Sequence, residues 1–368
     1  MKLPNLNIGN IMARLPIIQG GMGVAISMAD LAAAVANEGG IGVIATVGIC
    51  YNEPDAFTNF VESNKRALRN EIRKARSMTK GVLGVNILGA MTNYEDMVNT
   101  AIEEGIDVII SGAGLPLNLP RNRIQNNSNV KLVPIASSGR SAAIICKSWD
   151  NKYNCVPDAV IVEGPKAGGH LGFSRDELSR MEEHSLDKLV KDVIEAVKPY
   201  GEKYGREIPV IAAGGIYTGE DIAKFLEMGC AGVQMATRFV ATNECNADIK
   251  FKEAFISARE KDIVLIQSPV GLPGRAIMNK FLELVENGKK VPVKCAYHCL
   301  KTCKVEQSPY CIALALINAA KGKLENGFAF CGANAFRVKQ IVSVKELVCE
   351  LMTEAEIHFK GLVLKPAI

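Results

Sequence analysis

Short apolar segments alternate with longer segments of helical periodicity along the first two thirds of the chain. Each of the eight apolar segments is about as long as a β-strand and is apolar on both faces, which is typical of parallel strands covered by helices on both sides. In order they are Pro16–Met22, Gly40–Val47, Val82–Leu88, Ile106–Ser111, Lys131–Ala136, Ala159–Glu163, Pro209–Ala213 and Gly232–Val240.

The segments between these strands predict crossover helices. Several of them are followed by a glycine, which commonly ends a helix. The predicted helices are Met28–Asn37, Tyr94–Glu104, Ser138–Lys147, Ser185–Tyr200 and Gly219–Met228. Eight strands that alternate with helices predict an α/β fold of the (β/α)8, or TIM-barrel, type rather than a doubly wound sheet.

Glycine recurs where the predicted strands end, at the face of a TIM barrel that carries the active site. The residues at these ends are Gly20-Gly21-Met22-Gly23, Asn86, Glu163 with Gly168-Gly169-His170, Gly214-Gly215, and Gln234–Thr237. Glycine lets a backbone approach a ligand closely. Glycine turns at several strand ends therefore predict a large ligand held by main-chain groups.

The ends of the last two strands predict a phosphate site. Gly214-Gly215 follows the seventh strand and Ala236-Thr237 lies in the eighth, where barrels commonly bind phosphate through backbone N–H groups. The glycines alone also fit simple tight turns. If a phosphate binds, the pattern itself leaves FMN, a phosphosugar and pyridoxal phosphate open.

Five motifs together resemble those of the nitronate monooxygenase family, formerly called 2-nitropropane dioxygenases, which also contains flavin-dependent enoyl-ACP reductases. They are PIIQGGMG (16–23), GVNILGA (84–90), VEGPKAGGHLGF (162–173), IPVIAAGGI (208–216) and GVQMATRF (232–239). The resemblance implies an FMN-binding barrel formed by residues 1–240 and 336–368. It also implies an inserted helical subdomain after strand eight, here the cysteine-rich segment 241–335.

The resemblance also implies roles for individual residues. It places FMN against Gln19, Gly20, Gly21, Met22, Asn86, Glu163, Gly168 and Gly169, and the FMN phosphate on Gly214, Gly215, Gln234, Met235, Ala236 and Thr237. A side chain at position 168 or 169 would occupy space that the flavin needs. His170 is the implied catalytic residue, as a base or as a group that orients the substrate. The alternative is a structural role, in which this loop histidine holds the Gly-Gly turn by a hydrogen bond.

The implied activity is oxidation of alkyl nitronates. One alternative is an NAD(P)H-dependent enoyl-ACP reductase, and another, of a different class, is a flavin-binding redox or sensor module. The chain departs from the family pattern at Pro165-Lys166, where many members carry an acidic residue, and at Ala333, where relatives carry glutamine. Lys166, together with Arg275 in the predicted loop 268–278, is therefore a candidate contact for an anionic substrate.

Four cysteines in the inserted segment are candidate metal ligands. Cys295, Cys299 and Cys303 are four residues apart, so that on a helix they would form one stripe, and Cys311 follows. Four thiolates suit an iron–sulfur cluster or zinc. The alternative is that these cysteines are small buried hydrophobic residues.

Composition limits the partners and the compartment. A net charge of +4 on 368 residues does not indicate a nucleic-acid partner. We find no signal peptide and no apolar stretch of the roughly 20 residues that a membrane span requires. The sequence therefore predicts a cytoplasmic protein that acts on a small molecule, with NAD(P)H as a possible second substrate.

Overall fold

Eight parallel strands form the centre of the molecule. The computed structural model describes residues 2–119, 129–291, 295 and 298–360. The strands are β3 (Ile17–Gln19), β4 (Gly42–Ala45), β5 (Leu83–Leu88), β6 (Val108–Gly112), β7 (Lys131–Ala136), β8 (Val160–Glu163), β10 (Val210–Ala213) and β11 (Gly232–Met235). Their order is β3-β11-β10-β8-β7-β6-β5-β4. A parallel bridge between Ile18 and Ile41, next to β4, closes the ring, which confirms the predicted TIM barrel.

All eight predicted strands occur, and the first, second and last are each about half as long as predicted or less. The segment Gly232–Val240 forms strand β11 up to Met235 and then the short helix α9 (Thr237–Val240). The apolar run continues through both, because Phe239 and Val240 are buried in the helix as deeply as strand residues would be. The apolar pattern of this segment therefore predicted its burial correctly, but it did not predict its backbone conformation.

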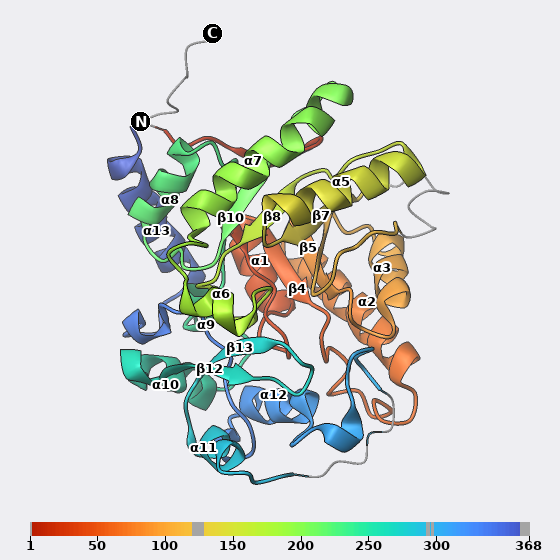
Figure 1. Ribbon diagram of the computed structural model, residues 1–368, viewed down its shortest axis with the longest axis vertical. Coiled ribbons are helices and arrows are strands. Elements are labelled where there is room, and N and C mark those ends of the chain that lie inside the picture. The colour runs from red at the N-terminus through yellow and green to blue at the C-terminus, as the bar shows by residue number, and fades with distance from the viewer. Residues whose placement is uncertain (1, 120–128, 292–294, 296–297, 361–368) are drawn as a thin grey trace.

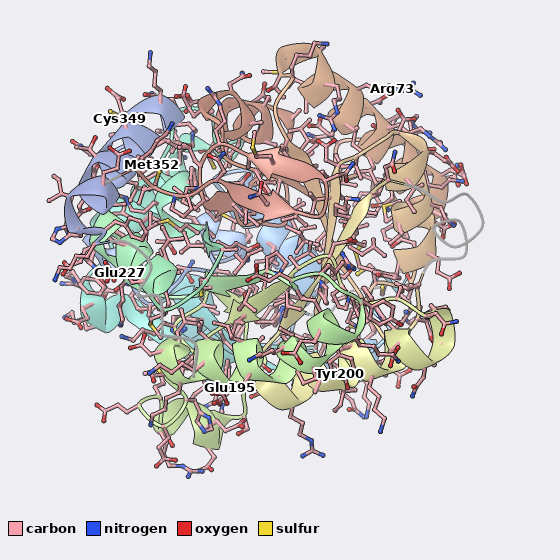
Figure 2. The ribbon with its side chains drawn as sticks, turned by 90° about the horizontal axis from the view of Figure 1, so that it is seen from above. Arg73, Glu195, Tyr200, Glu227, Cys349 and Met352 are labelled. Atoms are coloured by element: carbon pink, nitrogen blue, oxygen red, sulfur yellow. The ribbon has the colours of Figure 1, made fainter. Side chains whose placement is uncertain are left out.

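Helices surround the barrel (Figure 1). They are α1 (Ala29–Glu38), α2 (Phe60–Met78), α3 (Tyr94–Glu103), α5 (Gly139–Tyr153), α6 (Arg175–Ser179), α7 (Leu186–Lys203), α8 (Gly219–Glu227) and α13 (Val344–His358). Helix α13 packs against α8 and α1, and Glu354 accepts a hydrogen bond from the Gly219 N–H at the start of α8 (2.7 Å). Figure 2 shows Glu195 of α7 and Cys349 of α13 on the outside of this ring.

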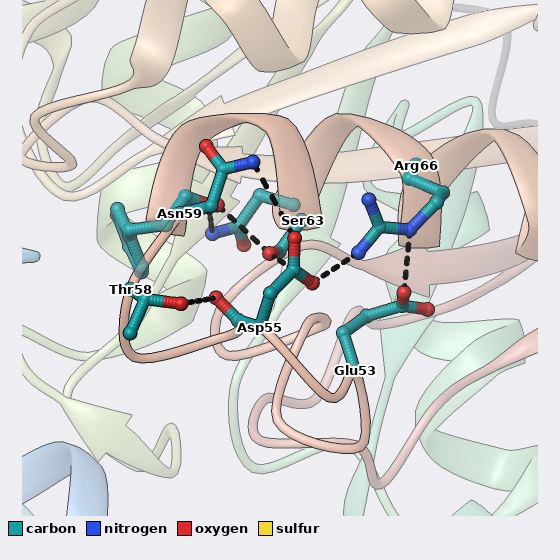
Figure 3. Close-up of polar contacts among 8 residues, drawn as sticks. Glu53, Asp55, Thr58, Asn59, Ser63 and Arg66 are labelled. Carbon is teal, nitrogen blue, oxygen red and sulfur yellow. Dashed lines mark hydrogen bonds and ion pairs between the residues drawn. The ribbon is translucent and has the colours of Figure 1, made fainter.

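The loop before α2 is fixed by a polar network (Figure 3). Asp55 accepts hydrogen bonds from Ser63 (2.9 Å) and from Arg66, and Arg66 also donates to Glu53 (2.6 Å). The hydrogen bonds from Ser63 and Arg66 lower the pKa of Asp55. These contacts tie the chain that leaves β4 to the first turns of α2.

The interior of the barrel is a packed aliphatic core. Its largest members include Ile18, Ile41 and Ile110, which are fully buried. An N-terminal hairpin, β1 (Leu6–Ile8) and β2 (Ile11–Ala13), contributes Leu6 and Ile8 to the same cluster. Because the hairpin precedes β3, it fills the barrel at the amino-terminal ends of the strands and leaves the carboxyl ends for a ligand.

The segment after β11 covers the carboxyl ends of the strands and contains strands as well as helices. It forms α10 (Ile249–Ser257), β12 (Ile263–Gln267), β13 (Pro273–Ile277), α11 (Lys280–Glu286) and α12 (Ile312–Ala320), which lie together on one side of the barrel in Figure 1. We predicted a helical subdomain here and a loop over 268–278. The helices occur, but residues 273–277 of the predicted loop form β13, which pairs with β12 and with β9 (Gly169–His170) in an antiparallel sheet.

None of the helices that the structure describes combines the length and the apolar character needed to cross a membrane.

Candidate active site

A cavity lies at the carboxyl ends of the barrel strands, between the barrel and the inserted segment. The space between its walls measures about 1040 Å³, including space that is open to solvent. Thirteen residues that we predicted from the sequence line it: Gly20, Gly21, Met22, Glu163, Lys166, Gly168, Gly169, Gly214, Gly215, Gln234, Met235, Ala236 and Thr237. The structure thus brings together residues from strands β3, β8, β10 and β11.

Two predicted cofactor residues lie behind the wall of the cavity. The Gln19 carboxamide is fully buried, accepts a hydrogen bond from the Val43 N–H (3.0 Å) and so joins β3 to β4. Asn86 is buried on β5, and its Cβ would be 2.4 Å from a Cβ at position 21. Both side chains therefore support the backbone that faces the cavity.

His170 lies at the edge of the cavity, on strand β9. Its neighbour Gly169 lines the cavity, and so does Phe330, whose ring meets the imidazole edge-on with centroids 5.0 Å apart. His170 Nε2 is 2.7 Å from Ser268 Oγ. Burial lowers the pKa of His170 to about 4, so the imidazole is neutral at pH 7 and has one nitrogen that donates and one that accepts.

One polar group of the cavity wall has no hydrogen-bond partner among the described residues, and a second is a desolvated carboxyl. The Gln234 Oε1 atom is buried and accepts no hydrogen bond from the described residues. Glu163 ends β8 at the cavity, and burial raises the pKa of its carboxyl to about 7. Because a buried polar group without a partner is costly, these two groups fit a site that a polar cofactor fills.

Lys166 and Arg275, the two candidate substrate contacts, occupy different surroundings. Carbon atoms of the exposed Lys166 side chain lie 2.8–3.5 Å from where a Cβ at Gly215 would stand, so this side chain runs past the predicted phosphate site. Arg275 is buried, and its guanidinium donates to the carbonyl groups of Pro165 (2.8 Å) and Ala167. Arg275 therefore holds the loop that leads to His170.

Gly168 and Gly169 are glycine for different reasons. A Cβ at Gly168 would lie 2.7–2.9 Å from backbone atoms of Cys331 and Gly332, so a close approach of two backbones excludes a side chain there. Gly169 has φ +74, and a Cβ there would meet no protein atom within 4 Å. Our sequence-based reason, that a side chain would take up cofactor space, stays a prediction for Gly169, whereas the close backbone approach is sufficient reason for glycine at position 168.

We expect Gly169→Ala to lower the affinity for FMN, the cofactor that the resemblance implies, about 10-fold or more, because the added methyl group would enter the space predicted for it. The left-handed backbone costs this variant only about 1–2 kcal/mol of stability.

We expect Gly168→Ala to lower the free energy of unfolding of the flavin-free protein by about 1–3 kcal/mol through overpacking. Fluorescence titration with FMN and urea unfolding measure the two effects. Unchanged FMN affinity in Gly169→Ala would contradict this assignment.

The sequence did not reveal the residues that the inserted segment brings to the site. Ser268 follows β12, and its hydroxyl is buried against His170, 98 positions away in the chain. The inserted segment also supplies apolar residues to the wall: Phe251, Phe255, Leu316, Phe330 and Cys331. The one sequence signal for Ser268 is its position as a polar residue directly after a strand. We missed this signal because we predicted a loop over 268–278 and no strand before it.

The spacing of four would place the cysteines on one stripe of a helix, but the described residues 298–304 are not helical. Leu300 forms an antiparallel bridge with Met91, and residues 301–302 form a turn. Within the described ranges, no group of three or more His, Cys, Asp or Glu side chains is arranged to hold a metal ion.

Comparisons with known proteins agree with this geometry. The model of the family described as nitronate monooxygenase matches residues 6–354. A probable nitronate monooxygenase of Staphylococcus saprophyticus is 27% identical over 307 residues, which are 77% of this chain and 81% of that protein. A dehydrogenase of Mycobacterium tuberculosis that acts on an indene-carboxyl-CoA is 30% identical over 275 residues. That match covers 75% of this chain and 66% of the dehydrogenase, slightly less than two thirds of its length.

Two solved structures share the fold over nearly the whole chain. FabK from Thermotoga maritima has a TM-score of 0.71 and 28% identity, with 94% of both chains covered. The nitroalkane oxidase from Streptomyces ansochromogenes has a TM-score of 0.70 and 23% identity, with 94% and 97% covered. Because the family match spans the barrel and the inserted segment alike, the chain belongs to the nitronate monooxygenase family and is a flavin-dependent oxidoreductase.

Proposed function

We propose that this protein is an FMN-dependent oxidoreductase that oxidises alkyl nitronates. The observation that best supports the proposal is the neutral imidazole of His170, which Ser268 holds at the edge of a glycine-lined cavity. When bound, FMN accepts electrons from the substrate and passes them to dioxygen. The protein's own residues then have to bind the cofactor, orient the substrate and limit the access of water.

The cofactor would be held by backbone groups along one side of the cavity. Gly214, Gly215, Ala236 and Thr237 line it at the ends of β10 and β11, where TIM barrels bind phosphate. We assign the charge of Lys166 to the same end, because its side chain runs past Gly215. A cation there favours the phosphorylated flavin over riboflavin.

His170 would orient the substrate by hydrogen bonding. Ser268 occupies Nε2, so Nδ1 is the ring nitrogen left for the substrate. A nitronate is already deprotonated at carbon and requires no base. A neutral nitroalkane requires one, and an imidazole with its pKa near 4 is a weak base at pH 7. The environment of His170 therefore favours nitronates over their nitroalkanes.

We expect ethylnitronate to reduce the bound flavin under anaerobic conditions at pH 7, about 100-fold faster than nitroethane. Stopped-flow measurement of the flavin absorbance gives both rates, and propionate-3-nitronate serves as a second anionic substrate. Rapid reduction by NADH or NADPH, together with no reaction with either nitronate, would contradict the proposal.

The second candidate is an NAD(P)H-dependent enoyl-thioester reductase of the enoyl-ACP type. It is favoured by the likeness to FabK over 94% of both chains and by the apolar wall of Phe251, Phe255, Leu316 and Phe330, which would suit an acyl chain. NADH oxidation that depends on an added enoyl thioester would identify this activity.

A further inference from the structure

The chain passes from the inserted segment back to the barrel through residues 330–334, which we call the return segment. It lies between α12 and α13. The Ala333 N–H donates to the carbonyl of Lys166, in the loop after β8 (3.0 Å). A Cβ at Gly332 would lie 2.6 Å from the hydroxyl oxygen of Thr237, which follows β11. The return segment therefore packs against two of the loops that line the cavity.

Asn334, the last residue of the return segment, contacts a third loop. Its side-chain nitrogen Nδ2 donates to the carbonyl of Gly215, which is 2.7 Å away and 119 positions away in the sequence. Gly215 belongs to the turn between β10 and α8, where Gly214 and Gly215 have left-handed backbones with φ +91 and +93. Asn334 is not one of the described residues that line the cavity. It therefore binds the predicted phosphate turn from outside the cavity.

The turn that Asn334 binds carries N–H groups without protein acceptors. Within the described part of the chain, the N–H groups of Gly214, Gly215 and Ile216 donate to no protein atom. All three residues line the cavity. Successive N–H groups in such a turn form a concave site for an anion, and a buried N–H group without a partner is costly. The turn is therefore suited to the phosphate of FMN, the cofactor of the proposed function.

Asn334 fixes the orientation of one of these N–H groups. The carbonyl of Gly215 and the N–H of Ile216 belong to one planar trans peptide unit, so they point in opposite directions. Because Asn334 holds this carbonyl from outside the cavity, the Ile216 N–H points away from Asn334. Glycine restricts its backbone less than any other residue, so loss of the hydrogen bond would leave this peptide unit free to rotate.

We propose that Asn334 is a positioning residue for the phosphate of FMN. It acts through the peptide unit between Gly215 and Ile216, since its own side chain does not line the cavity. Riboflavin lacks the phosphate, so this role gives Asn334 a share of the preference for FMN over riboflavin. The inference rests on the FMN binding of the proposed function, and it is independent of which substrate the enzyme oxidises.

The test is the affinity of the flavin-free, full-length protein for FMN and for riboflavin, measured by quenching of flavin fluorescence. We expect Asn334→Ala to lower the affinity for FMN about 10-fold and that for riboflavin less than about 2-fold. A merely structural role would lower both affinities together. Asn318→Ala is the matched control, because Asn318 is also half-buried and its Nδ2 donates to the carbonyl of Asn326 (3.1 Å). Its two affinities should equal those of the wild type.

Equal losses of affinity for FMN and riboflavin in Asn334→Ala, or no loss for either, would overturn the proposal. Circular dichroism tests whether this variant folds. If it unfolds, Asn334→Leu decides by the same ratio of affinities, because leucine keeps the branched shape but has no N–H donor. A wild type that binds riboflavin as tightly as FMN would overturn the phosphate site and this proposal together. A wild type that prefers FMN but does not react with nitronates would contradict the proposed activity alone.

Discussion

Replacing His170 by asparagine is expected to lower kcat/KM for ethylnitronate about 10²–10³-fold, the usual effect of removing one hydrogen-bonding group from a reacting centre. Bound FMN should be unchanged, because the contacts assigned to the cofactor come from β3, β8, β10 and β11 and their loops. His184→Asn is the matched control, since His184 lies against Phe173 (ring centroids 6.2 Å apart) and outside the residues that line the cavity. Steady-state oxygen consumption measures both variants.

The same residue sets an expectation for the pH dependence. Because burial holds the pKa of His170 near 4, kcat/KM of the wild type should show no ionisation of this imidazole between pH 5 and 8. An inflection near pH 6.5 that disappears in His170→Asn would show that the imidazole titrates normally. That result would contradict the hydrogen-bonding role proposed for the neutral ring.

Replacing Glu163 by glutamine is expected to stabilise the flavin-free protein at pH 8 by up to about 3.5 kcal/mol. The pKa of Glu163 rises from 4.5 to about 7 on folding because the carboxyl is buried. The folded state therefore binds more protons than the unfolded chain between these values, and stability falls as pH increases from about 4.5 to about 7. Glutamine does not ionise, so the variant does not lose this part of its free energy of unfolding. Each unit by which folding shifts the pKa corresponds to about 1.4 kcal/mol.

Urea unfolding of wild type and Glu163→Gln at pH 5 and pH 8 tests this expectation. The difference between the two proteins isolates Glu163 from His170, whose lowered pKa acts in the opposite direction, so that stability is lost as pH falls from about 6.5 to about 4. Glu195→Gln, on the exposed surface of α7 (Figure 2), is the control for a neutralised surface carboxylate. An equal gain at both pH values in Glu163→Gln would show that the carboxyl is not desolvated.

The barrel was predictable from sequence because its strands are buried on both faces. Such strands appear as continuous apolar runs, and eight of them alternate with helices of suitable length. The cavity was predictable for a related reason, since the carboxyl ends of parallel strands meet at one face. Residues that follow directly after strands, such as Gly214 and Gly215, therefore gather at that face without further information.

The remainder of the site depends on contacts between distant parts of the chain. Ser268 reaches His170 because β13 pairs with β9, and a periodicity within one segment carries no information about such pairing. The same limit applies to the cysteines. Their spacing of four is compatible with a helix, but Leu300 instead forms a bridge with Met91, which is distant in the sequence. Gln19 shows a further limit. Its side chain lies at a strand end and was predicted to contact the cofactor, but it joins β3 to β4 instead. The sequence does not distinguish these two orientations.

The pairing of β9 with β13 also affects how such a protein can diversify. The histidine is encoded within the barrel, but its serine partner and the arginine that fixes its loop are both encoded in the inserted segment. One contiguous stretch of the sequence therefore carries part of the cavity wall together with the two side chains that hold His170 and its loop in place. Exchange of this stretch alone would replace that wall and the partners of His170 in one step, and it would leave the glycines at the barrel strand ends unchanged.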